Sequence, residues 1–459
     1  MNIKSPSPWH QWIWIFLATL LIAAKTYQTS LDAYWRLPPK PLGDGIDYEN
    51  MAWNLAHGKG VAFDWTSEEW RSAYHAHDQD GRYALFLNRN TPYHLTTSRP
   101  PLYPLWISTI YRITGHGPLS WMLVRTSNAS FLALSILLAG WMVYRWTLTR
   151  WEDHRLAWLG AAFTMALGML DKTTSSYAAD FLTEPMAMLL TQLLVILAWS
   201  QFPRRPLLKH LSLGFCIGLM VYCRSLFVFY IPFIALIIGL PPSESSSTTG
   251  RLQSMVTVLI VALLLLSPWW VRNSMILDRW MPLGTQGPIT LLGGYCDEAL
   301  KAGGEWQGSA DLALRAELKQ DPEFEKLAPN SQELIVADEA NRRVRLWIAD
   351  HRSDLPYLAV ARAYQLWSPF TGKSLIWKIL MILGCLVLIH QRSREGLWLV
   401  GLPLITTIIV MGLYSTGSRF LVPCFGLLYA LAGIGVVGAV HWTRLLGPSA
   451  TETERRTQS

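Results

Sequence analysis

Two aspartates lie three residues apart in a short polar stretch that follows the first long apolar segment of the chain. They are Asp44 and Asp47, within residues 43–50. A carboxylate held just outside a membrane can act as a general base that takes a proton from an acceptor hydroxyl. Because Asp also favours helix N-termini, either side chain could instead cap a helix that begins near Tyr48.

A second pair of acids precedes a later apolar segment. Asp180 and Glu184 are four residues apart, so they would share one face if both lay on a helix. Glu184 is followed by Pro185, which is favoured in the first turn of a helix, where acids also favour the helix dipole. A carboxylate this close to hydrocarbon needs a partner, however. Capping and substrate binding therefore both remain open for this pair.

Several arginines lie near or within apolar segments. The usual role of such arginines is to anchor a segment by reaching toward the membrane surface. A set that converges can also grip a phosphate, because guanidinium binds phosphate oxygens bidentately. Arg125 is placed within an apolar segment and needs a partner, for which Asp44, Asp47 and Asp180 are candidates. The set comprises Arg99, Arg125, Arg224, Arg272 and Arg419.

Sequence patterns for metal, cofactor or nucleotide binding are weaker or not found. His75, His77 and Asp78 could ligate a metal, so a divalent cation is possible, although three mixed ligands in a polar loop are a weak pattern. The sequence identifies no cofactor. It contains no convincing phosphate-binding loop, dinucleotide fingerprint or serine nucleophile elbow. This favours a substrate that arrives already activated over work driven by ATP.

The composition indicates a membrane protein. The 459 residues are 51% hydrophobic and only 15% charged, whereas soluble domains carry about 25% charged residues. The net charge of +7 does not indicate nucleic-acid binding, because Lys and Arg occur mostly in short connections between apolar segments. That pattern is typical of cytoplasmic loops. We therefore predict an all-α polytopic membrane protein.

Apolar runs predict ten membrane-crossing segments, and a bundle of about 10–12 transmembrane helices is expected. The extracytoplasmic loops should carry short interfacial helices, and the Pro-rich stretch 99–113 is expected to lie along the interface. The fifth and sixth segments could instead form one broken hairpin. The predicted segments are 11–27, 119–144, 156–170, 182–199, 210–222, 226–240, 252–271, 374–390, 397–414 and 420–442.

The expected topology places the N-terminus in the cytoplasm, because most basic clusters then face inward. Both long loops, Asp44, Arg224 and Arg419 would then share the opposite side. The predicted division is an N-terminal catalytic module 1–271 with a first extracytoplasmic loop 34–99, a long extracytoplasmic loop 272–357, C-terminal helices 358–445 and a disordered cytoplasmic tail 446–459.

Six short motifs occur in an order that resembles the GT-C membrane glycosyltransferases, in particular the branch that is similar to protein mannosyltransferases and aminoarabinose transferases. The resemblance extends to about residue 440. The last motif departs from the family pattern, with Phe420 where the family has Tyr. The motifs are an acidic loop (43–48 and 52–60), Pro-Pro-Leu-Tyr-Pro (within 99–104), an Arg-containing start of a span (124–128), Thr-Glu-Pro (182–185), Pro-Trp-x-x-Arg-Asn (267–273) and Arg-Phe-x-x-Pro (418–423).

The resemblance implies an enzyme of the inner (plasma) membrane that moves a sugar, with inversion, from a polyprenyl-phosphate donor to an extracytoplasmic lipid, glycan or protein acceptor. Asp44 matches the family's first-loop acid and is the expected base, with Asp47 as the fallback. Asp180 and Glu184 would position the sugar or acceptor, and Tyr103 would contribute to substrate binding. The arginines would hold the departing phosphate, and the loop 272–357 would set specificity.

Two other function classes remain open from the sequence. One is a secondary transporter or lipid flippase, which would often show internal repeats and charges near the midplane. No repeat is found here, and the acids cluster toward one face. The other is a non-catalytic membrane protein of polysaccharide assembly that has kept the scaffold.

Overall fold

Helices make up nearly all of the regular structure in the computed structural model, which describes residues 8–41, 43–78, 80–200, 206–239, 248–368 and 375–446. Within these residues the two named strands, β1 (Ala62–Phe63) and β2 (His94–Leu95), form one short antiparallel pair. The predicted all-α class is confirmed. The expected cytoplasmic tail lies outside the described residues from position 447 onward.

Each of the ten predicted apolar segments coincides with a helix of the bundle. The segment 226–240 opens with the 3-10 turn η1 (Ser225–Phe229), and the last segment opens with η4 (Arg419–Cys424). The helices are α1 (Pro8–Ser30), α6 (Pro118–Trp151), α7 (His154–Leu170), α9 (Glu184–Trp199), α10 (Pro206–Cys223), α11 (Tyr230–Gly239), α12 (Thr248–Ile276), α19 (Leu375–His390), α20 (Glu395–Gly412) and α21 (Phe425–Leu446).

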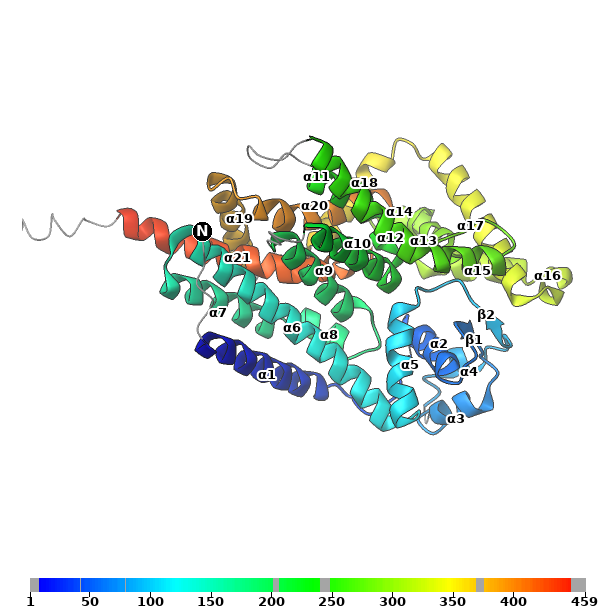
Figure 1. Ribbon diagram of the computed structural model, residues 1–459. Coiled ribbons are helices and arrows are strands. Elements are labelled where there is room, and N and C mark those ends of the chain that lie inside the picture. The colour runs from blue at the N-terminus through cyan, green and yellow to red at the C-terminus, as the bar shows by residue number, and fades with distance from the viewer. Residues whose placement is uncertain are drawn as a thin grey trace, which may run out of the picture.

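Shorter helices gather at one end of this bundle (Figure 1). They come from the two long polar stretches of the sequence, and both groups, α2–α5 and α13–α17, lie at the same end. Their bounds are α2 (Gly45–Ala56), α3 (Glu68–His75), α4 (Ala84–Leu87), α5 (Leu102–Thr114), α13 (Gln286–Gly294), α14 (Asp297–Lys301), α15 (Gly308–Leu318), α16 (Pro322–Lys326) and α17 (Pro329–Asp350). Two further short helices are α8 (Lys172–Ala178), which lies between α7 and α9 in the chain, and α18 (Leu355–Trp367), which precedes α19.

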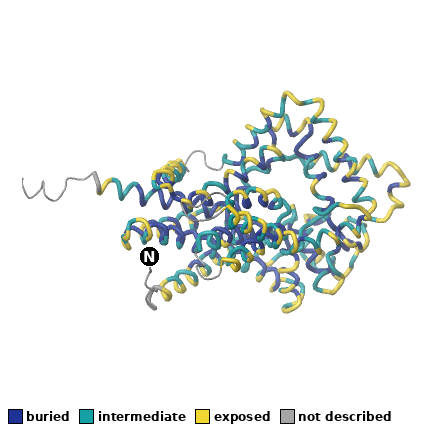
Figure 2. The backbone as a smooth tube through the Cα atoms, turned by 45° about the horizontal axis from the view of Figure 1, so that its top comes forward, coloured by how far each residue is buried: buried dark blue, intermediate teal, exposed yellow. Residues whose placement is uncertain are grey.

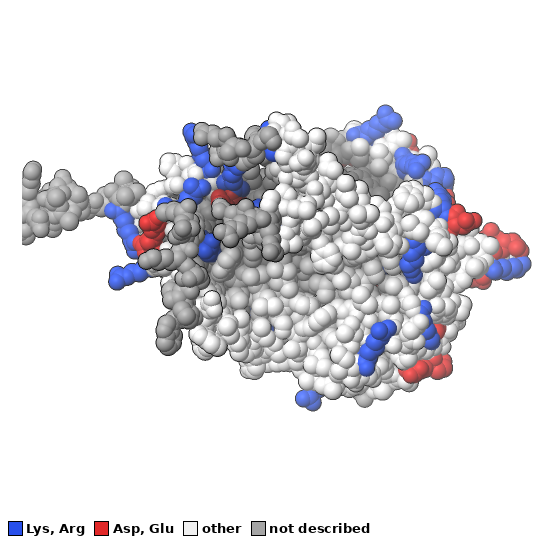
Figure 3. Space-filling model, in the orientation of Figure 1, with Lys and Arg blue, Asp and Glu red and all other residues white. Residues whose placement is uncertain are grey.

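The surface of the bundle is suited to a membrane. Charged side chains gather toward the two ends of the molecule in Figure 3, and the broad middle of this face is almost free of them. Among the described residues, five helices are long and apolar enough to cross a bilayer, and three shorter helices are also apolar. The protein is therefore a multi-pass membrane protein.

The helix at the centre of the bundle is α21. Within residues 417–444, which include most of α21, 94% of the most apolar 18-residue stretch is buried. Figure 2 shows buried segments concentrated where the bundle helices pack. Gly384 of α19 and Gly435 of α21 face the partner helix so closely that an added Cβ would meet a backbone oxygen, of Leu431 and Leu380 respectively. Small residues let membrane helices approach in this way.

The second long polar stretch has a hydrophobic core of its own. Helices α13, α15 and α17 bury apolar side chains against one another, separately from the core of the bundle. This layer is joined to the bundle by the Tyr295 hydroxyl, which donates to the carbonyl of Gly412 at 2.6 Å. The buried residues are Ile289, Leu292, Tyr295, Leu314, Phe324, Val336, Ala340 and Val344.

Candidate functional site

Asp44 sits at the N-cap position of α2, yet in the described structure its side chain makes no capping hydrogen bond. Its two oxygens are taken by guanidinium groups instead. Oδ1 lies 2.7 Å from Nη2 of Arg99, and Oδ2 lies 2.7 Å from Nη2 of Arg419. The capping explanation for Asp44 is therefore wrong: the acid pairs with cations that are distant in sequence.

Asp47 lies one turn further along α2 and joins the same group. Its Oδ2 accepts a hydrogen bond from Nη2 of Arg99 at 2.7 Å, so Arg99 bridges both aspartates. Its Oδ1 lies 3.6 Å from Nη1 of Arg89. Arg89 was not identified from the sequence, because it stands in a polar loop away from any apolar segment.

Glu184 is the first residue of α9, and its side chain is 0% exposed. Its Oε1 lies 2.6 Å from Nη1 of Arg224 and also accepts from Nε of Arg419. Its Oε2 has no hydrogen-bond partner among the described residues, and neither does Nε of Arg99. The predicted need of Glu184 for a partner is met by two arginines, and one of its oxygens remains unused.

The bundle brings these residues to one place because their helices begin or end at the same level. Helix α9 begins at Glu184 and runs away from the site, and α10 returns to end at Cys223, directly before Arg224. Arg419 opens η4, which leads into α21. Asp44 and Arg419 are 375 residues apart in sequence. We call Asp44, Asp47, Glu184, Arg89, Arg99, Arg224 and Arg419 the acid–arginine cluster.

Positive charge exceeds negative charge in this cluster, with four guanidinium groups against three carboxylates. Burial alone would raise the pKa of Asp44, but the charges of Arg99, Arg419 and Arg224 outweigh it and hold that pKa well below its ordinary value. Burial raises the pKa of the neighbouring Tyr48 to about 12. Asp44 is thus ionised and fully paired, and Tyr48 is neutral.

Asp180 is buried beside the cluster but does not share a helix face with Glu184. The two acids do not lie on one helix, because α8 ends at Ala178 and α9 begins only at Glu184, so Asp180 lies in the turn between them. Its Oδ1 accepts from the backbone N–H groups of Phe181 at 2.8 Å and Lys40 at 3.2 Å. Burial raises the pKa of Asp180. This acid ties the turn to the loop before α2.

Arg125 is fully buried in α6, and its partners are backbone carbonyls rather than the expected carboxylate. It donates to Leu37 and Ala179, each at 2.8 Å, and to Pro38 at 3.1 Å. The expectation of an acidic partner is wrong, because the backbone carbonyls of the loop before α2 and of the turn before α9 accept the hydrogen bonds of the guanidinium. Arg125 therefore holds in place the loops that precede Asp44 and Glu184.

Tyr103 and Arg272 also act on backbone and neighbouring side chains. The Tyr103 hydroxyl donates to Oδ1 of Asn128 at 3.2 Å, and Nδ2 of Asn128 donates to the carbonyl of Asp180 at 2.8 Å. Arg272 donates to the carbonyls of Val61 at 2.7 Å and Thr96 at 2.9 Å. Arg272 thus joins the end of α12 to the strand pair, outside the acid–arginine cluster.

The predicted metal ligands do not assemble. Among the described residues, no group of three or more His, Cys, Asp or Glu side chains could hold a metal ion. His77 packs its ring edge-on against Trp121, and Oδ1 of Asp78 accepts from the backbone N–H of Tyr83 at 2.8 Å. The described structure therefore does not bring His75, His77 and Asp78 together as a set of metal ligands.

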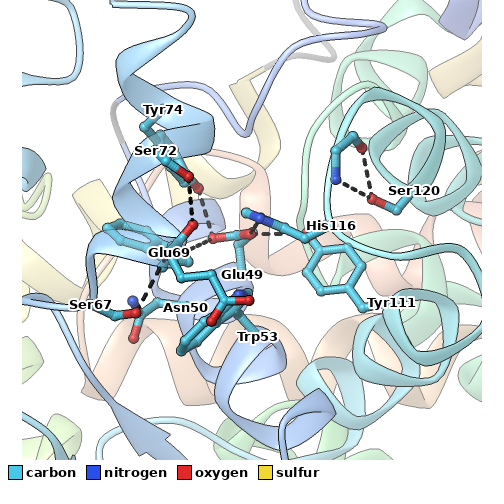
Figure 4. Close-up of polar contacts among 12 residues, drawn as sticks. Glu49, Asn50, Trp53, Ser67, Glu69, Ser72, Tyr74, Tyr111, His116 and Ser120 are labelled. Atoms are coloured by element: carbon cyan, nitrogen blue, oxygen red, sulfur yellow. Dashed lines mark hydrogen bonds and ion pairs between the residues drawn. The ribbon is translucent and has the colours of Figure 1, made fainter.

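A buried carboxylate that the sequence did not single out is Glu49 on α2 (Figure 4). Its Oε2 accepts from Nε1 of Trp70 at 2.6 Å and from the Tyr74 hydroxyl at 2.8 Å. Its Oε1 accepts from the Tyr111 hydroxyl at 3.1 Å and contacts Nε2 of His116 at 2.5 Å. Glu49 joins α2, α3, α5 and the turn before α6. The sequence feature that could have pointed to Glu49 is the high number of aromatic residues in the first loop, two of which, Trp70 and Tyr74, bind it.

A cavity of about 530 Å³ opens beside Glu49, at the opposite end of α2 from Asp44. His57 is thirteen residues beyond Asp44, which corresponds to roughly 20 Å of helix, so this cavity is remote from the acid–arginine cluster. Figure 4 shows Glu69, Tyr111 and His116, which are among the residues that line it. Its lining includes Trp53, His57, Glu69, Tyr111, Arg112 and His116.

Among known proteins, a similarity to this chain is found at the level of structure and not of sequence families. No protein-family model matches the sequence, and no curated protein matches it. The archaeal oligosaccharyltransferase AglB from Archaeoglobus fulgidus, solved with an inhibitory peptide and a dolichol-phosphate, is similar with a TM-score of 0.47 and 16% identity. The match covers 96% of this chain and 52% of AglB, so the chain spans about half the length of that enzyme. This similarity assigns no role to any residue of the chain.

Proposed function

We propose that this protein is a membrane glycosyltransferase of the GT-C type that moves a sugar from a polyprenyl-phosphate donor to an acceptor outside the cytoplasm. The observation that carries the proposal is the acid–arginine cluster, in which Asp44 and Glu184 are both bound by Arg419. A base, an unused carboxylate oxygen and several guanidinium groups in one place are the parts that this transfer needs. The order of the six sequence motifs supports the same reaction.

In the proposed reaction the acceptor hydroxyl oxygen attacks the anomeric carbon of the donor from the side opposite the phosphate. A new bond forms between that oxygen and the anomeric carbon, and the bond from the carbon to the phosphate oxygen breaks. The bonding electrons leave with the phosphate, and the hydroxyl proton passes to Asp44, with Asp47 as the alternative base. The attack from the opposite side inverts the anomeric configuration.

The arginines of the cluster would stabilise the leaving group. A polyprenyl-phosphate sugar is a phosphodiester with one negative charge, and its departure as a monoester adds a second. Arg99, Arg224 and Arg419 carry fixed positive charge at the place where this charge would develop. An already activated donor also agrees with the lack of an ATP-binding motif in the sequence.

Glu184 is suited to hold a hydroxyl group of the donor sugar or the acceptor. Its Oε2 is buried without a partner in the described structure, and a buried acceptor of this kind favours an incoming donor. The roles of Asp180, Tyr103, Arg125 and Arg272 are proposed to be indirect, through the loops that they hold. These four residues would position the loops of the site and would not contact the substrate directly.

The proposed side of the membrane follows from the two groups of polar helices. Both lie at the end of the bundle where the acid–arginine cluster is found (Figure 1). The Arg-rich connections near Arg150 and Arg394 belong to the other end, as the positive-inside tendency favours for cytoplasmic loops. We therefore propose an enzyme of the inner membrane with its site on the extracytoplasmic face and a hexosyl or pentosyl donor. The helical layer α13–α17 would select the acceptor.

The test uses the full chain in lipid nanodiscs with radiolabelled polyprenyl-phosphate sugars and measures release of polyprenyl phosphate. Asp44→Asn should lower turnover by about 10²–10⁴-fold, the usual contribution of a general base. Glu184→Gln should also lower turnover. A matched control is Asp80→Asn, which removes a carboxylate of the same loop that pairs at 2.7 Å with Arg82 on the surface. This control should keep full turnover.

The outcome also separates the alternative functions. Scrambling or uptake of a labelled lipid that survives both Asp44→Asn and Glu184→Gln would favour a flippase or transporter. A folded wild-type protein that releases no polyprenyl phosphate from any donor and acceptor pair would favour a non-catalytic role in polysaccharide assembly. Either result would contradict the proposed transfer.

A further inference from the structure

Both oxygens of Asp44 are in contact with guanidinium groups in this structure. Arg99 occupies Oδ1 and Arg419 occupies Oδ2, each at 2.7 Å. A general base works best when its pKa lies near the working pH, whereas these guanidinium groups stabilise the charged carboxylate and hold the pKa of Asp44 well below its ordinary value. As it stands, the proposed base is ionised but weakened by the same arginines that are proposed to bind the phosphate.

We propose that the phosphate of the lipid donor displaces Asp44 from Arg419, so that donor binding itself releases the base. This inference rests on the proposed function and concerns the regulation of the same site. In the absence of the donor, the Asp44 carboxylate would occupy the place on Arg419 that the donor phosphate takes when it binds. An unloaded site would then hold its base in an inactive form.

The contacts of Arg419 make it the point of exchange. It is the one arginine of the cluster that binds both Asp44 and Glu184 in the described structure, and 24% of its side chain is exposed. Arg224 is less exposed, at 11%, and it holds Glu184 at 2.6 Å. Loss of Asp44 would thus leave Arg419 anchored by Glu184 through its Nε, with its Nη2 turned to the incoming phosphate.

The charge of the cluster also fits an anion. Four guanidinium groups face three carboxylates, which leaves one positive charge without a counterion in the cluster. A phosphodiester brings one negative charge and would neutralise it. Guanidinium binds phosphate oxygens bidentately, so a phosphate can compete with a carboxylate that holds Arg419 through a single nitrogen.

The exchange makes an unusual prediction, because removing the proposed base should improve binding of a lipid phosphate. We would measure the binding of farnesyl phosphate to the full-length protein in nanodiscs. Asp44→Asn removes the competing charge from Arg419 and should tighten binding by about tenfold, which corresponds to about 1.4 kcal/mol. Asp47→Asn, which leaves the Asp44–Arg419 pair in place, should tighten binding less. Arg419→Gln should weaken it.

Controls identify the group that is recognised. Farnesol, which lacks the phosphate, should bind equally to the wild-type protein and Asp44→Asn. Inorganic phosphate should compete weakly if the lipid chain contributes to binding, and as well as farnesyl phosphate if the site takes free phosphate, which would overturn the assignment to the lipid donor. Asp80→Asn should leave the affinity for farnesyl phosphate unchanged. Thermal unfolding of each variant establishes that it is folded.

Two results would overturn the inference in different ways. If Arg419→Gln weakens binding but Asp44→Asn and Asp47→Asn leave it unchanged or weaker, the arginines bind phosphate without displacing the base, and the proposed function survives alone. If the wild-type protein and all variants fail to bind farnesyl phosphate, the lipid-phosphate donor is wrong and the exchange falls with it.

Discussion

The pair of Glu184 and Arg224 allows the electrostatics of the site to be tested apart from any reaction. Glu184 is 0% exposed, Arg224 is 11% exposed, and the two side chains are 2.6 Å apart. Glu184→Gln leaves the guanidinium of Arg224 buried without its counterion, and Arg224→Gln leaves the carboxylate with Arg419 alone. Removing one partner of a buried pair costs about 3–5 kcal/mol, so each variant should lose about this much free energy of unfolding.

The double variant decides whether the loss comes from the pair. Once Glu184 is neutral, removal of Arg224 no longer breaks an ion pair, so the two losses should not add. Coupling energies between contacting residues are about 0.5–3 kcal/mol, and a value of about 2 kcal/mol is expected for this buried contact. The measurement is unfolding in mixed detergent micelles, followed by far-UV circular dichroism.

An exposed pair of the same chemistry serves as the control. Arg279 and Asp338 lie 2.7 Å apart with side chains 51% and 47% exposed. Surface pairs contribute about 0.2–1 kcal/mol, so Asp338→Asn and Arg279→Gln should each change the unfolding free energy little. Losses at Glu184 and Arg224 that add within about 0.5 kcal/mol, or that match the exposed pair, would refute the reasoning.

Three further predictions concern the first loop and its contacts. Glu49→Ala should destabilise the protein by at least about 3 kcal/mol, because it leaves several buried donors unpaired; unchanged protease resistance of the loop would contradict this. Burial opposes the charged form of His94, but the hydrogen bonds that its ring makes to the Glu333 carboxylate and the Pro92 carbonyl outweigh it and raise the pKa of His94. The contact should therefore stabilise below the ordinary pKa of His94 and weaken as pH rises through the raised value; hydrogen exchange near His94, corrected for intrinsic rates, should increase with pH in the wild type and not in His94→Gln. Gly284→Ala should cost more than about 1–2 kcal/mol in thermal unfolding, because φ is +74° and the added Cβ would meet the carbonyl oxygen of Thr97; an unchanged melting temperature would contradict it.

The helices of the bundle could be predicted well from the sequence. A segment in lipid must satisfy its own backbone hydrogen bonds, so a long apolar run has one solution, the helix. The run 119–144 accordingly lies within α6, and 374–390 coincides with α19 to within one residue. The polar stretch 272–357 carries no such constraint. Its separate core around Phe324 and Val336 was not predicted, because short helices with few apolar residues leave a weak pattern.

The sequence by itself determined the membrane class, the positions of the apolar segments, Asp44 and the arginines as candidate site residues, and Glu184 and Arg125 as residues in need of partners. These follow from hydropathy and from the cost of burying a charge, which are local properties of the chain. Only the tertiary structure decided which charges pair. Arg419 binds Asp44 across 375 residues of sequence, while Arg125 binds carbonyls and Arg272 lies elsewhere. The physical reason is that an ion pair depends on distances of a few ångströms, and the packing of the helices alone sets them.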